Sequence, residues 1–99
     1  MFIHVVFFWC KAGTPETVKQ EMITYCRQEM AKISVVRNVN AGTAVPSPRD
    51  VVDGSYDVGL CVMFDDKAGH DAYQPHEIHQ GFVAKFKEHW DRIQVYDFQ

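Results

Sequence analysis

The stretch covering residues 2–10 constrains the fold more than any other part of the chain. If it forms a strand, its side chains alternate between two faces. One face would carry Ile3, Val5, Phe7 and Trp9, and the other His4, Val6, Phe8 and Cys10. Because nearly all of these residues are apolar, both faces of the strand need cover. The sequence therefore predicts a sheet enclosed between two other layers.

The rest of the chain supplies an alternation of helices and strands. The patterns predict a helix over 15–33, strands over 35–45 and 56–64, a short helix ending near Tyr73, a helix over 75–90 and a strand over 93–98. The proline-containing stretch 46–55 is predicted to be a long loop. This order, βαββαβ, is that of a ferredoxin-like α+β fold, in which a four-stranded antiparallel sheet carries its helices on one face.

A protomer of this kind leaves the second face of its sheet bare, although the strands are apolar on both sides. The chain has 99 residues, of which 46% are hydrophobic and 13% aromatic, and one small core cannot hide so much apolar surface. We therefore expect a single domain over residues 1–99 that pairs through the bare face into a homodimer, a dimeric α+β barrel. The rival interpretation is a monomer whose long loop folds over the sheet.

Charge and cysteine content argue against several classes of protein. The net charge is −3 and no basic run is present, so we expect no nucleic-acid partner. The apolar run over residues 2–9 is too short to cross a bilayer and lacks a basic flank, so we expect no membrane partner. The cysteines, Cys10, Cys26 and Cys61, show no CxxC spacing, which favours a reduced cytoplasmic protein without disulfides.

The candidate functional residues gather between Tyr73 and the end of the helix predicted over 75–90. His79 precedes Val83 and Phe86 at steps of four and three, so it lies at the edge of that helix's buried face. An imidazole, with an ordinary pKa of about 6.5, can exchange protons near neutral pH. The alternative is a structural histidine that is hydrogen-bonded within the core.

Short motifs along nearly the whole chain resemble those of a known family. They are His4-Val5-Val6, Gly54-Ser55-Tyr56-Asp57, Tyr73 with His76 and His79, Phe82, and Val95-Tyr96-Asp97-Phe98. Together they look like the stress-responsive A/B barrel family, abbreviated Dabb. The resemblance implies a ferredoxin-like protomer and a homodimer. It extends distantly to a plant polyketide cyclase that makes olivetolic acid by aldol condensation, without a metal or organic cofactor.

Carried over residue by residue, this resemblance implies catalytic roles for Tyr73 and His79. His79 would remove a proton from a carbon between two carbonyls, while Tyr73 would hydrogen-bond the developing oxyanion. His4, His76 and Phe82 would bind the substrate. The implied function is a cofactor-independent cyclase or lyase that acts on a polyketide-like or other enolisable carbonyl compound.

Other interpretations stay open beside this one. The barrel could instead bind a small hydrophobic or aromatic metabolite without catalysis, or act as a cofactor-free monooxygenase. His76 could cap the start of its helix. His76 and His79 with Glu77 between them fall short of the three or four ligands of a firm zinc site, so we expect no metal. His70 and His89 are expected at the surface.

Overall fold

The computed structural model describes all 99 residues, and its four strands form one antiparallel sheet in the order β2-β3-β1-β4. The elements are β1 (Phe2–Cys10), α1 (Glu16–Gln28), η1 (Met30–Lys32), β2 (Asn38–Gly42), β3 (Val58–Phe64), α2 (Lys67–Tyr73), α3 (Glu77–Phe86), η2 (Lys87–His89) and β4 (Trp90–Phe98). Strand β1 is central and pairs antiparallel with both β3 and β4. The prediction of a ferredoxin-like α+β fold is confirmed.

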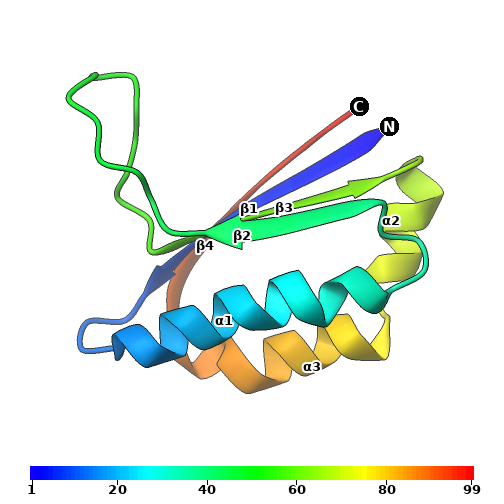
Figure 1. Cartoon of the computed structure of the whole chain (residues 1–99), viewed down its shortest axis with the longest axis horizontal. Helices are drawn as coiled ribbons and strands as arrows, with labels where there is room; N and C mark the ends of the chain where they lie inside the picture. Colours follow the sequence, from blue (N-terminus) through cyan, green and yellow to red (C-terminus); the bar gives the residue numbers. More distant parts are fainter.

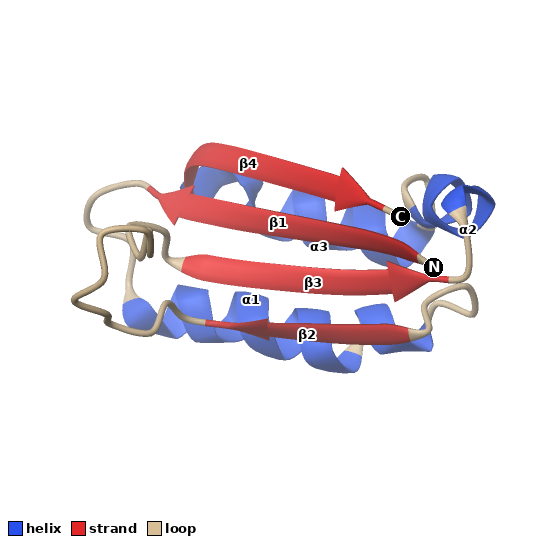
Figure 2. Cartoon of the chain, turned by 90° about the horizontal axis from the view of Figure 1, so that it is seen from above, coloured by secondary structure: helices blue, strands red, loops and turns tan.

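The helices cover one face of the sheet and leave the other bare. Figure 1 shows α1 and α3 beneath the sheet, and Figure 2 shows the open face, with α2 at the end where both termini lie. The alternation in β1 follows from this arrangement, because Val6 and Phe8 are buried whereas Val5 and Phe7 are only half-buried. No helix is long and apolar enough to cross a membrane.

The core lies between the sheet and the two long helices. Its largest fully buried side chains include Phe64 of β3, Met22 of α1, and Phe82 and Phe86 of α3. The apolar stripes at helical spacing in α1 and α3 supply one half of this core, and the helix-facing residues of β1 and β3 supply the other. Helix α2 is held by the same core, because its last residue, Tyr73, is fully buried in it next to the start of α3.

The loop between β2 and β3 does not cover the open face. Figures 1 and 2 show it standing away from one end of the sheet, on the side opposite the helices. Tyr56, at the base of this loop, packs against Phe7 with ring centroids 4.7 Å apart, and Ser55 accepts a hydrogen bond from the Trp9 indole at 3.0 Å. The loop therefore contacts only one end of the open face, and the rest of that face stays uncovered in this protomer.

Several predicted boundaries differ from the structure. Helix α1 ends at Gln28, and the chain tightens into a 3-10 turn, η1, before reaching Ile33. Strand β2 is shorter than 35–45 because Val36 closes a turn onto the Ile33 carbonyl. Strand β4 starts at Trp90, three residues earlier than expected, and so includes the last residue of the helix predicted over 75–90.

The predicted helix starts also need correction. Pro15 lies at the N-cap of α1 and not inside the helix, and the Thr14 hydroxyl before it donates to the Lys11 carbonyl. Pro75 lies outside α3, because the N-cap of that helix is His76. The His76 Nδ1 accepts a hydrogen bond from the Ile78 amide at 3.1 Å, which confirms the capping interpretation of this residue.

Asp66 holds the start of α2, since its carboxylate accepts a hydrogen bond from the Gly69 amide at 3.0 Å. Replacing Asp66 with alanine should lower the free energy of unfolding by about 1 kcal/mol, the usual effect of losing an N-cap. Urea unfolding monitored by circular dichroism measures this change. Asp50→Ala, in the exposed loop, is the matched control and should unfold like the wild type; equal losses in both variants would contradict the capping role.

Candidate active site

A cavity of about 240 Å³ lies between the helix-facing side of β1 and β4 and the helix α3. Its walls are mainly apolar, with Val6, Phe8, Phe82, Trp90 and Val95 among them. The polar side chains on its lining are His4, Tyr73, Gln74 and His79. Such a small apolar space with a few convergent polar groups has the character of a small-molecule site.

His79, in the first turn of α3, is held in a defined orientation. Its Nδ1 lies 2.9 Å from the Gln74 carbonyl oxygen, which can only accept a hydrogen bond. Nδ1 therefore carries the proton of the neutral ring, and Nε2 keeps a free lone pair. Burial lowers the pKa of His79, with the Gln74 carbonyl acting in the opposite direction. The imidazole is thus neutral at pH 7 and able to accept a proton.

Tyr73, the last residue of α2, packs against this imidazole with ring centroids 4.6 Å apart. The two residues predicted from the sequence to act together are therefore neighbours in space. Burial raises the pKa of Tyr73 far above its ordinary value, so the phenol stays protonated and keeps its O–H as a hydrogen-bond donor. Its hydroxyl donates to the Met30 sulfur at 3.4 Å, and a thioether is a weak acceptor.

His4 lies on the cavity wall and pairs with Asp97, a residue of the closing sequence motif to which no role in the site was assigned. The His4 Nδ1 is 2.5 Å from Asp97 Oδ1, because the register of β1 and β4 places these two residues opposite each other. Burial lowers the pKa of His4, and the hydrogen bond to Asp97 opposes that shift. The sequence signal for Asp97 is its charge within the closing strand. In the structure it lies opposite His4, the one polar residue among the buried residues of β1.

The remaining predicted residues divide between the cavity and other places. Phe82 lines the cavity, whereas His76 lies outside its lining and is engaged at the α3 cap. The expectation of a surface His70 is wrong: its side chain is only 14% exposed and stacks on Phe2 with ring centroids 4.6 Å apart. The Trp90 indole N–H, on the cavity wall, is buried without a hydrogen-bond partner.

The lowered pKa values of the two buried histidines predict a stability that depends on pH. In the unfolded chain His4 and His79 protonate as the pH falls through about 6.5, whereas in the folded protein they resist protonation until lower pH. The unfolded state then binds more protons, so the free energy of unfolding should fall as the pH is lowered from about 6.5 to the folded-state pKa values. Thermal unfolding between pH 7.5 and pH 5 measures this, and His79→Gln should flatten the dependence.

Structural neighbours share this fold at low sequence identity. A dimeric protein of unknown function from Bacteroides fragilis is 20% identical with a TM-score of 0.83, over 99% of this chain and 94% of that one. A hydroxynitrile lyase from Passiflora edulis is 16% identical with a TM-score of 0.81, over 98% and 90% of the two chains. An antibiotic biosynthesis monooxygenase is 13% identical with a TM-score of 0.72, over 100% and 97%.

Comparison of sequences assigns the chain to a family, which structural similarity at this low identity does not do. No curated protein matches the chain in sequence. The family described as Stress responsive A/B Barrel Domain, or Dabb, matches it over residues 2–99, nearly its full length. The predicted resemblance is confirmed, and the chain belongs to the stress-responsive A/B barrel family.

Proposed function

We propose that this protein is a cofactor-independent acid–base catalyst, with His79 as the base and Tyr73 as the oxyanion donor. The substrate class is an enolisable carbonyl compound with an apolar group, for example a polyketide-like chain. The observation that carries the proposal is the arrangement of His79, whose Nδ1 is fixed by the Gln74 carbonyl while a neutral ring lines an apolar cavity beside Tyr73.

The chemistry follows from the two protonation states. The neutral His79 removes a proton from the carbon next to the substrate carbonyl, and charge develops on the carbonyl oxygen. Tyr73, which stays protonated, can turn its hydroxyl from the weak Met30 sulfur acceptor toward this stronger one. The unpartnered Trp90 N–H is a second donor on the same wall for a polar atom of the substrate. His79 then returns its proton to the product.

One structural neighbour with this fold is a lyase, which supports a lyase-type reaction. A hydroxynitrile lyase shares this fold, so the architecture is compatible with a lyase. A monooxygenase shares the fold as well, but no residue arrangement in the present cavity favours oxygen chemistry over proton transfer. A non-catalytic binding barrel would use the same cavity and differs from the enzyme only in having no turnover.

The proposal includes a homodimer formed through the open face of the sheet. This face carries half-buried apolar residues of β1, and β4 adds Tyr96 and Phe98, which are 57% and 56% exposed. A hollow of about 410 Å³ lies on the same side, lined in part by Val5, Phe7 and Tyr56. Neighbours of the same fold are described as dimeric, which supports a second copy as the partner of this face.

Proton abstraction can be measured without knowing the natural substrate. A 2-alkyl β-keto ester has a single acidic proton between two carbonyls, and its exchange for deuterium in heavy water is followed by NMR. We expect the wild-type protein to accelerate this exchange catalytically above the buffer rate. If a panel of such esters with alkyl groups of different lengths binds but exchanges at the buffer rate, the protein is a binding barrel and not this enzyme.

A further inference from the structure

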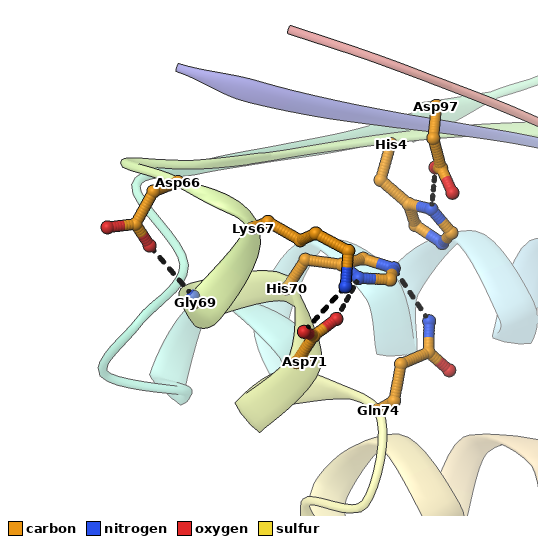
Figure 3. Close-up of polar contacts among 8 residues, drawn as sticks. All are labelled: His4, Asp66, Lys67, Gly69, His70, Asp71, Gln74 and Asp97. Atoms are coloured by element: carbon orange, nitrogen blue, oxygen red, sulfur yellow. Dashed lines mark hydrogen bonds and ion pairs between the residues drawn. The ribbon is translucent and has the colours of Figure 1, made fainter.

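A second cluster of ligand-type side chains lies next to the cavity. One nitrogen each from His4 and His70 and one carboxylate oxygen of Asp97 lie within 4.8 Å of one another. Figure 3 shows how three elements bring them together: His4 hangs from β1 and Asp97 from the adjacent β4, and His70 approaches from α2. Two imidazoles and one carboxylate, with positions left open, are a common ligand set for divalent transition metals.

His70 is prepared for this role by its own neighbours. Its Nδ1 lies 3.2 Å from Asp71 Oδ1, and Lys67 holds the other oxygen of that carboxylate at 2.8 Å. The carboxylate fixes the ring proton on Nδ1, so that Nε2 carries the lone pair. Histidine ligands of metals commonly have such a carboxylate partner, which fixes the ring and raises its basicity. Stacking on Phe2 further restrains the ring.

We propose that His4, His70 and Asp97 form a binding site for a divalent transition metal ion of the zinc type, at the α2 end of the cavity. This goes beyond the proposed acid–base function, which needs no metal. It also departs from the expectation drawn from the sequence, where only His76 and His79 were considered as ligands, and His76 is engaged at the α3 cap.

The geometry sets what binding requires. Zinc lies roughly 2.0–2.2 Å from nitrogen and oxygen ligands, so its ligand atoms are about 3.4 Å apart. Ligand atoms now up to 4.8 Å apart have to approach by up to about 1.4 Å, and the His4 and Asp97 atoms, now 2.5 Å apart, have to separate by about 0.9 Å. The proton between His4 and Asp97 leaves when the ion takes its place. Gln74, whose amide nitrogen is 3.1 Å from His70 Nε2, moves aside. The carboxylate side chain of Asp97 is 36% exposed, which gives an ion a path from solvent.

Direct binding tests the site independently of turnover. Metal-free protein is titrated with Zn²⁺ in a calorimeter and with Co²⁺ by visible absorption, and we expect one ion per protomer. His70→Gln and Asp97→Asn should each weaken binding at least tenfold, whereas His89→Ala, which removes a histidine outside the cluster, should bind like the wild type. Circular dichroism confirms that each variant is folded, and His70→Gln, on α2, carries the test if Asp97→Asn unfolds.

Two results would overturn the metal site. The first is a wild-type protein that takes up neither ion, and the second is binding that both cluster variants leave unchanged. The β-keto ester exchange measured with and without a chelator separates this proposal from the catalytic one. If exchange persists with chelator and the chelator-free protein binds one ion, both proposals are supported. If exchange is intact but the protein binds no ion, only the metal site is refuted.

Discussion

Replacing His79 with alanine should reduce the deuterium exchange of a β-keto ester by roughly 10²- to 10⁴-fold, the range typical of losing a general base. The reason is local: the Gln74 carbonyl holds the His79 ring on the cavity lining with its Nε2 unpartnered, beside the protonated Tyr73. His4, the other imidazole on the lining, faces Asp97. Initial exchange rates at pH 7 and a saturating ester concentration measure the effect.

The controls separate catalysis from folding and from binding. His79→Gln keeps an N–H that can reach the Gln74 carbonyl but cannot take up a proton, so it should be as inactive as His79→Ala while keeping the wild-type melting temperature. His89→Ala, outside the cavity, should exchange at the wild-type rate. Tyr73→Phe should retain the base His79 but lose the oxyanion donor, so its exchange rate should fall less than that of His79→Ala. If His79→Ala exchanges deuterium at the wild-type rate, His79 is not the base.

Replacing Val5 with glutamate should convert the proposed dimer into a monomer. Val5 lies at the centre of the open face, opposite Cys61 on β3 and Tyr96 on β4. A two-fold interface doubles any substitution, so two new carboxylates would be buried near each other in an apolar contact. A penalty of about 3 kcal/mol or more corresponds to a dimer weakened at least about 100-fold. Sedimentation across a range of protein concentrations measures the dissociation constant.

The matched control for this variant adds the same charge to the opposite side of the molecule. Thr17 lies on the exposed side of α1, away from the open face, so Thr17→Glu should leave the proposed dimer unchanged. Circular dichroism of the Val5→Glu monomer should show retained helices, because the core lies on the other side of the sheet. A Val5→Glu protein that sediments as a wild-type dimer would place the interface elsewhere.

The sequence predicted the fold well because hydrophobic periodicity carries most of that information. The doubly apolar β1 and the helical stripes of α1 and α3 appear in the structure as a sheet with helices on one face. The boundaries were less predictable, since they depend on individual hydrogen bonds. Thr14 could cap a helix by type, but its hydroxyl bonds backward to Lys11. Trp90 fits a helical stripe by spacing, yet pairing with Cys10 draws it into β4.

The candidate site was predictable only in part, for a related reason. Tyr73 and His79 are close in sequence, so their proximity follows from one turn between two helices. Asp97 and His70 reach His4 through strand register and through the docking of α2, which single-sequence patterns do not specify. His70 looked like a surface residue because its sequence neighbours are polar. Its aromatic neighbours in the structure are Phe2 and His4 of β1 and Phe64 of β3.

The pairing of His4 with Asp97 also has a consequence for the order of folding. These two residues are 93 positions apart, so the cluster exists only after β4 has docked against β1. Contacts this distant in sequence form slowly, because closing so long a loop costs entropy before any contact repays it. A partly folded chain with its helices and the β2–β3 pair in place would have no cavity wall on the β4 side. A ligand would therefore bind only the finished fold and delay its unfolding.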